Sequence, residues 1–303
     1  MNFKRKLSIG YFLPEKYSIC ECLEHYGEYI GEVYFPVKGI ANGRGISIFD
    51  ANDEKEMLEE LKIIEAAGIK LNLLLNANCY GGESLSKKFG KQIKTAVEKA
   101  CEFIELNIVT ASSLFVASVI KENFNKLEVR ASVNMNIGSV NEVRYVEDYF
   151  DSFCVARNLN RKMDELQTVS NYIHSKGKKI SILANSGCLL NCPAHTFHDN
   201  LVSHENELVM HENLMAFKGV CWDFYAKNCT SKDFIENSTW ITPEQISLYS
   251  NMVDYIKLAT RVHKNPGKVI EAYVDQQYDG NVLGLMEPDF SSYHTIKTKD
   301  VLV

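Results

Sequence analysis

The chain has 303 residues, of which 46% are hydrophobic and 24% are charged. This composition is typical of a globular protein with a large core and excludes a disordered chain. The formal net charge of −6 and the pI near 5.8 give no general attraction to nucleic acid or to an anionic membrane, although a local basic patch stays open.

The N-terminus lacks the features of a secretion signal, because Pro14, Glu15 and Lys16 break the apolar stretch that follows the first basic residues. No run approaches the roughly 20 apolar residues of a membrane helix. The nine cysteines are an odd number, and without a secretion signal they favour a reducing compartment in which thiols persist or bind metal. We therefore predict a cytoplasmic protein.

The first half of the chain alternates predicted strands and helices. The helix over 53–67 repeats apolar residues at helical spacing, and Gly68 stands where a C-cap glycine belongs. A short helical segment lies between the first two predicted strands. The predicted strands cover 6–12, 31–37, 69–75, 104–109 and 127–133, and the other helices cover 86–102 and 112–124.

The same alternation continues in the second half, and the tail beyond residue 278 is polar and irregular, so we expect it to pack on the rest of the chain or on a partner. Eight strands, most of them followed by a helix, fit a closed (β/α)8 TIM-like barrel better than an open doubly wound sheet. We predict one barrel domain over 1–303. The remaining predicted strands cover 152–156, 179–184 and 254–259. The remaining helices cover 139–149, a segment that carries Met163, Leu166, Val169 and Ile173, a short one from Pro243, and 266–277.

Polar side chains follow the predicted strands at the edge where such barrels carry their active sites. We predict that Asn134, Asn136 and Asn185 bind substrate. The cationic side chains of this edge suit a carboxylate or phosphate on a small molecule, and the alternative for each is an ion pair that joins strand to helix. The predicted catalytic residues are Arg157, His195, Lys257 and Arg261.

The excursion over 185–242, between the seventh and eighth strands, is far longer than ordinary connections. It carries Cys188-x3-Cys192, then Cys221 and Cys229. Thiolates gathered in this way are typical ligands of one metal centre, and we favour an iron–sulfur cluster. The alternatives are a structural zinc site that fastens the loop, and free buried thiols.

Several histidines lie in the same excursion, and His195 is the best functional candidate among them. Pro193 fixes the backbone near Cys192, so a side chain two residues later can turn back towards the barrel. In the zinc alternative, His195 or His198 replaces one of the four cysteines as a ligand. Of the other cysteines, Cys101 and Cys154 lie in apolar patterns that indicate core packing.

One part of the chain, 180–262, carries a recognisable order of motifs. It runs Asn185-Ser-Gly-Cys188-x3-Cys192-Pro193-x-His195, then Cys221, then Ser238-Thr-Trp-Ile241-Thr-Pro243-Glu244, then Tyr249 and Asp254-Tyr-Ile-Lys257-Leu-Ala-Thr-Arg261. This order resembles the collagenase-like peptidase family, U32.

The resemblance implies a (β/α) barrel with a [4Fe-4S] cluster on Cys188, Cys192, Cys221 and Cys229, and places Arg261 on the family's arginine after the last strand. Several members take part in oxygen-independent hydroxylation of ubiquinone precursors or of RNA bases. This chain departs from the pattern: Thr242 replaces an arginine and Gln245 an acidic residue. We therefore expect a different small-molecule substrate.

Three functions follow from these observations. The first is an iron–sulfur enzyme of oxygen-independent redox chemistry, with hydroxylation of a small molecule at the barrel mouth. The second is a peptidase, in line with the family's name, although no Ser-His-Asp order, His-Glu-x-x-His helix or Gly-x-Ser-x-Gly elbow is present in the sequence. The third is a non-catalytic subunit that holds a protein partner in a heteromer.

Overall fold

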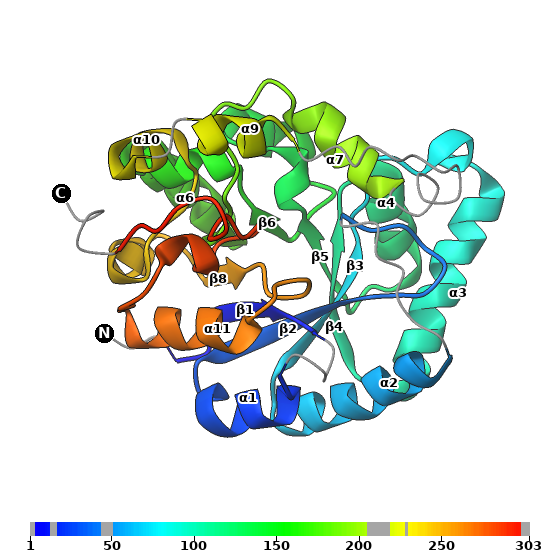
Figure 1. Cartoon of the computed structure of the whole chain (residues 1–303). Coiled ribbons are helices and arrows are strands. Elements are labelled where there is room, and N and C mark those ends of the chain that lie inside the picture. The colour runs from blue at the N-terminus through cyan, green and yellow to red at the C-terminus, as the bar shows by residue number, and fades with distance from the viewer. Residues whose placement is uncertain (1–3, 13–16, 44–50, 205–218, 228–229, 298–303) are drawn as a thin grey trace.

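The computed structural model describes residues 4–12, 17–43, 51–204, 219–227 and 230–297, with side chains from residue 54 onwards in the third range. Eight parallel strands close into a barrel in chain order, β1 to β8 (Figure 1). The predicted (β/α)8 fold is confirmed. The strands are β1 (Leu7–Gly10), β2 (Ile30–Pro36), β3 (Lys70–Leu75), β4 (Leu106–Ala111), β5 (Glu128–Ala131), β6 (Ser152–Cys154), β7 (Lys179–Leu183) and β8 (Tyr255–Leu258).

Helices cover the outside of the barrel and begin and end at the expected chemical signals. Ser86 and Ser113 cap two of the helices by accepting a backbone N–H of the first turn. Gly68 follows α2 with φ +69°, a left-handed conformation that favours glycine. The helices on the barrel wall are α1 (Ile19–Tyr26), α2 (Ala51–Ala66), α3 (Lys87–Phe103), α4 (Leu114–Asn123), α5 (Val140–Val146), α6 (Met163–Ser175) and α11 (Pro266–Asp275).

Side chains alternate across the strands, and the outward ones form the main core. Ile9, Val33 and Leu73 are fully buried in the hydrophobic cluster between barrel and helices. The inward side chains of the same strands include Ser8, Glu32 and Asn72, which are also buried. The inside of the barrel is therefore polar at this level.

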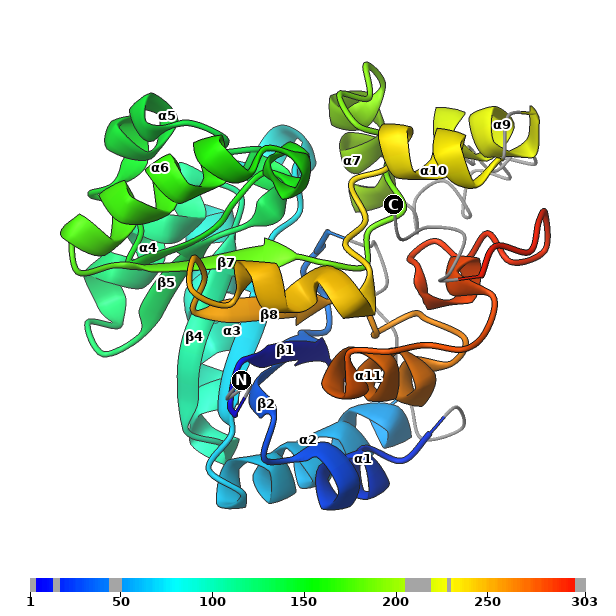
Figure 2. The same cartoon turned by 90° about the vertical axis from the view of Figure 1, so that its left-hand side faces the viewer.

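The excursion leaves and re-enters the barrel as a pair of extended segments, which we call the stem (184–190 with 237–241). Thr239 N donates to Cys188 O at 2.9 Å, and Ile241 N donates to Ala184 O at 2.9 Å. Beyond the stem the described helices are α7 (His195–Ser203), α9 (Val220–Lys227) and α10 (Ser231–Asn237). Figure 2 shows them grouped to one side of the barrel, together with the segment that follows α11.

The segment after residue 278 is not a polar tail, and that part of our prediction is wrong. Leu283, Met286 and Phe290 are fully buried in a second hydrophobic cluster with Tyr225 and Trp240 of the excursion. The segment therefore packs on the excursion through these side chains, while Leu285 joins the main core of the barrel. It also contains a short 3₁₀ helix, η5 (Val282–Leu285).

Two smaller expectations have different outcomes. Cys154 is buried on β6 as predicted, whereas Cys101 is exposed on α3, so the core packing predicted for it is wrong. The helix predicted from Pro243 is a 3₁₀ helix, η4 (Pro243–Tyr249), and Thr242 caps it by accepting from Gln245 N. Among the described helices, none combines the length and the apolar character required to cross a membrane.

Candidate active site at the barrel mouth

A small cavity of about 80 Å³ lies at the C-terminal end of the barrel, which we call the mouth. Residues from or just after β2, β3, β5, β6, β7 and β8 line it, so it is built where barrels of this fold carry their active sites. The lining is Tyr34, Gly43, Leu74, Asn76, Val133, Asn134, Arg157, Leu183, Lys257, Ala259, Arg261, Val262 and Glu287.

Three of the predicted catalytic residues line this cavity together: Arg157, Lys257 and Arg261. Arg261 is 8% exposed, and its Nη2 donates to Asn42 Oδ1 at 2.8 Å. Arginine stays charged when buried, so two permanent cations face a small space. Such a space suits an anion that two guanidinium groups can hold.

Lys257 is half-buried on β8, with its Nζ 4.1 Å from the centre of the Tyr34 ring. The Tyr34 hydroxyl donates to Leu258 O at 2.8 Å, which holds the ring in place. Burial lowers the pKa of Lys257 to about 8, and Arg130 and Arg261 act in the same direction, against Cys154 and Glu32. The amine is therefore partly neutral at the pH of a cell.

His195 is brought to Arg157 but does not line the cavity. Its Nε2 lies 2.5 Å from Arg157 Nη1 and 3.1 Å from Asp199 Oδ2. Arg157 Nη2 donates to Asn134 Oδ1 at 3.1 Å. Burial and then Arg157 lower the pKa of His195, against Asp199. A neutral ring accepts the Arg157 hydrogen bond, so the chain of contacts ties α7 to the mouth.

The three predicted substrate-binding asparagines have different places. Asn134 lines the cavity. Asn185 is fully buried away from it, where its amide accepts from Ala259 N at 2.6 Å and donates to Leu285 O at 3.1 Å. Asn136 is exposed at the end of a 3₁₀ turn, with φ 55°. Neither Asn185 nor Asn136 lines the cavity, and the fold uses the Asn185 amide, so substrate binding by these two residues stays a prediction.

Three cysteines of the excursion, Cys188, Cys192 and Cys221, lie near one another. Burial raises the pKa of Cys221 to about 12, and the nearby Cys188 and Cys192 thiols add to this rise. Even so, no group of three or more His, Cys, Asp or Glu side chains in the described ranges is arranged to hold a metal ion. Cys229, the predicted fourth ligand, lies outside the described residues. The donor chemistry suits a cluster, but the described side chains do not form its ligand geometry.

Sequence reasoning missed three residues of this region. Glu287 lines the cavity from the segment after α11, and Tyr34 lines it from the middle of β2. Asp199 joins the Arg157 contact from α7. The i, i+4 spacing of His195 and Asp199 was available as a signal. Nothing in the sequence indicated Glu287, since its place depends on how the last segment folds back.

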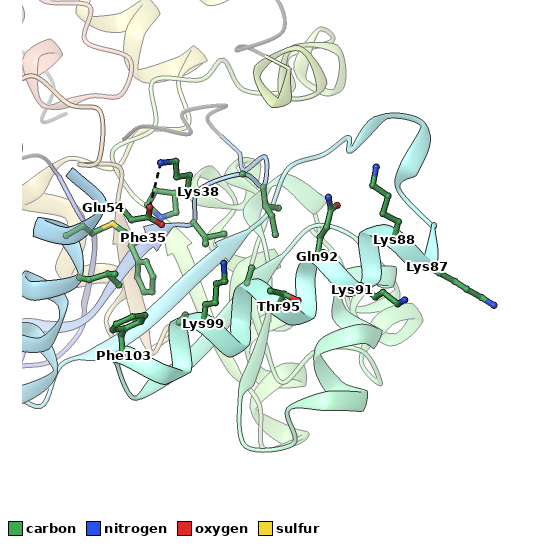
Figure 3. A pocket seen from close by; sticks show the side chains of 18 residues that line it. Phe35, Lys38, Glu54, Lys87, Lys88, Lys91, Gln92, Thr95, Lys99 and Phe103 are labelled. Carbon is green, nitrogen blue, oxygen red and sulfur yellow. Dashed lines mark ion pairs between the residues drawn. The ribbon is translucent and has the colours of Figure 1, made fainter. Parts of the chain in front are cut away.

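A larger cavity, of about 840 Å³, lies outside the barrel between α2 and α3 (Figure 3). Lysines of α3 and the loop after β2 line it above an apolar floor, and Lys38 pairs with Glu54 at 3.7 Å. Among the described residues, its lining contains no Cys, Ser, His or Tyr side chain and no buried polar group. We therefore assign the chemistry to the mouth, in spite of its smaller volume.

Comparisons with known proteins give two relatives whose names are those of proteases. An uncharacterized protease of Methanocaldococcus jannaschii is 25% identical over 272 residues, which cover 87% of this chain and 76% of that protein. A collagenase of Porphyromonas gingivalis is 25% identical over 284 residues, covering 83% of this chain and 63% of the collagenase. The chain thus spans less than two thirds of the collagenase.

Among solved structures, the U32 peptidase Mk0906 superposes with a TM-score of 0.59 at 13% identity, over 84% of this chain and 92% of that one. At this identity the likeness concerns the fold. No protein-family model matches the chain.

Proposed function

Since the chain belongs to the collagenase-like peptidase family, U32, we propose that it is an enzyme that binds the carboxylate of a small substrate at the barrel mouth. Peptide hydrolysis is the first candidate reaction, because two relatives are named a protease and a collagenase. The activities of those proteins as wholes are proposals for this chain, which spans only part of each.

The observation that carries the proposal is the convergence of Arg157, Lys257 and Arg261 on one cavity of about 80 Å³. Two guanidinium groups and one amine face a single carboxylate, Glu287, so the lining carries an excess of positive charge that favours an anion. The cavity admits a small group only, such as the carboxylate end of a short peptide. Charged guanidinium groups bind carboxylates through paired hydrogen bonds.

The same lining offers the groups that hydrolysis needs. Glu287 is a carboxylate of the cavity wall and is the candidate base for an attacking water. Arg157 or Arg261 can stabilise the oxyanion that develops on the scissile carbonyl. No metal is required for this scheme, which separates it from the second candidate.

The test is cleavage of short peptides with a free or an amidated C-terminus. We expect cleavage of the free form only, and a loss of about 100-fold in kcat/KM for Arg261→Gln. Arg144→Gln, an exposed arginine of α5, is the matched control and should keep full activity. Activity must survive chelation and Cys188→Ala. Equal cleavage of amidated peptides would refute the carboxylate site.

Oxygen-independent redox chemistry on an iron–sulfur cluster is the second candidate, and the nearness of the Cys188, Cys192 and Cys221 thiols favours it. With Cys229 these residues would hold the cluster, which when bound would supply electron transfer or Lewis-acid binding of a substrate. Purification without oxygen, with iron and sulfide analysis, tests it. We expect Cys188→Ser to lose iron and the exposed Cys101→Ser to keep it; zinc without sulfide would contradict this candidate.

A further inference from the structure

Lys257 is an amine in the wall of the cavity, and no described residue neutralises it through an ion pair. Within the described parts of the chain its Nζ makes no hydrogen bond or ion pair, and its contact is the face of the Tyr34 ring at 4.1 Å. A lysine held in this way is accessible from the cavity that it lines. Its position in the middle of β8 fixes the start of its side chain on a rigid strand.

An ion pair does not explain this lysine. Glu32, the buried carboxylate whose charge acts on it, is bonded to Arg130 at 2.5 Å and to Ser8 at 2.5 Å. The charge of Glu32 is therefore already neutralised by Arg130. A structural lysine at this depth would be costly, because burial without a charged partner disfavours the ammonium form.

We propose that Lys257 is a Schiff-base lysine that condenses with the carbonyl group of a small 2-oxo acid, whose carboxylate is held by Arg261 and Arg157. The inference rests on the proposed carboxylate site of the mouth but does not require peptide cleavage. It adds a covalent step and a substrate class. Desolvation of a lysine beside other cations is the usual way in which enzymes prepare this nucleophile.

The step balances without an external oxidant or reductant. The Lys257 amine adds to the carbonyl carbon, so a C–N bond forms and one amine proton moves to the carbonyl oxygen. Loss of water from this carbinolamine then breaks the C–O bond and leaves the imine. Glu287, in the same lining, is the carboxyl group that can carry the proton between nitrogen and oxygen.

The charge around the amine supports the assignment. With a pKa of about 8, the neutral fraction of Lys257 at pH 7 is roughly 300-fold that of an ordinary lysine. Leu74, Val133 and Leu183 give the cavity lining an apolar part. The charged or titratable groups that face the amine are Glu32 and Tyr34 of β2, Arg130 of β5, Cys154 of β6, and Arg157, Arg261 and Glu287 in the loops.

Trapping with borohydride tests the proposal on the full chain. The protein is incubated with pyruvate and sodium borohydride, digested, and mapped by mass spectrometry. We expect one reduced pyruvate adduct, on the peptide that contains Lys257, with a labelling rate that rises between pH 7 and pH 9. L-Lactate, which has the carboxylate but no ketone, should suppress labelling by competition.

Two variants and one binding measurement make the result decisive. Lys257→Met should lose the adduct, whereas Lys99→Met, at an exposed lysine of α3, should keep it. Labels spread over exposed lysines and insensitive to lactate would overturn the proposal. Calorimetric binding of both pyruvate and lactate without an adduct would overturn the imine but keep the carboxylate site, and binding of neither would overturn both.

Discussion

At the scale of single residues, the cationic side chains of the mouth differ in how readily they lose a proton. Arg157 and Arg261 cannot release a proton at physiological pH, whereas burial, and then Arg130 and Arg261, lower the pKa of Lys257. The pKa of lysine falls on burial because its ammonium is a compact charge that is stabilised by hydration. In the function that we propose, the two arginines hold an anion and the lysine acts as a nucleophile.

Asn185 gives a prediction at this scale. Its amide makes three hydrogen bonds to the backbone of Ala259 and Leu285, all within the fold. Asn185→Ala leaves these buried groups without partners and should lower the free energy of unfolding by about 3 kcal/mol. Urea denaturation measures this. Asn136→Ala, at an exposed turn, should cost only about 1 kcal/mol, and equal losses would contradict the assignment.

At the scale of elements, the stem and the last segment complete the mouth. Gly187 N donates to Glu287 O at 3.0 Å, and Glu287 N donates to Asn185 O at 2.8 Å. The segment after α11 thus runs beside the stem and carries Glu287 into the cavity lining. Phe290 holds the same segment in place, since the centre of its ring lies 5.0 Å from that of the Tyr225 ring and 4.8 Å from that of the Trp222 ring.

Gly187→Ala tests this arrangement. A Cβ at residue 187 would lie 2.5 Å from Cε2 of the buried Phe290 ring, which has no free space to move into. We expect a loss of about 1–3 kcal/mol in the free energy of unfolding, together with weaker binding of a carboxylate because Glu287 shifts. Gly82→Ala is the control: nothing lies near its Cβ, and its stability should stay unchanged.

At the scale of the whole molecule, charged groups tie the barrel strands together from inside. Arg130 of β5 bonds to Glu32 of β2 at 2.5 Å and to Glu128 at 2.9 Å, and Lys179 of β7 also pairs with Glu128 at 2.9 Å. The Arg130 guanidinium also stacks on Tyr255 of β8. An ionic network therefore joins β2, β5 and β7, and a cation–π contact links it to β8.

The network predicts how stability depends on pH. Although burial alone would raise it, Arg130, Ser152 and Lys179 lower the pKa of Glu128 from 4.5 to about 2. A carboxyl group whose pKa is lower in the folded than in the unfolded state stabilises the fold at a pH above its unfolded-state pKa. This contribution is lost as the pH falls towards its folded-state pKa. We expect about 3 kcal/mol to be lost between pH 5 and pH 2.

Thermal or urea unfolding across this pH range measures the loss. Glu128→Gln should be less stable at neutral pH and should show a flatter dependence on pH than the parent chain. Glu98→Gln, an exposed carboxylate of α3, is the control and should leave the profile as it was. An identical slope for Glu128→Gln and the parent would contradict the role of the network.

Much of the fold was predictable from local patterns. The strand from 179 and the helix that ends before Gly68 carry their own signals, namely a short β-rich run and a left-handed glycine. Polar residues after strand ends were also readable, which placed Arg157 and Arg261 at the mouth. Asn185 and Asn136 share that signal, so position after a strand did not separate cavity residues from structural ones.

The sequence by itself determined the barrel, the order of its strands and the edge at which polar groups gather, because these depend on periodicity and chain direction. Only the tertiary structure decided which groups meet. It paired Arg157 with His195, brought Glu287 back along the stem, and left Lys257 on Tyr34 beside a carboxylate already bonded to Arg130. Contacts between residues far apart in sequence depend on packing and burial, which no local pattern encodes.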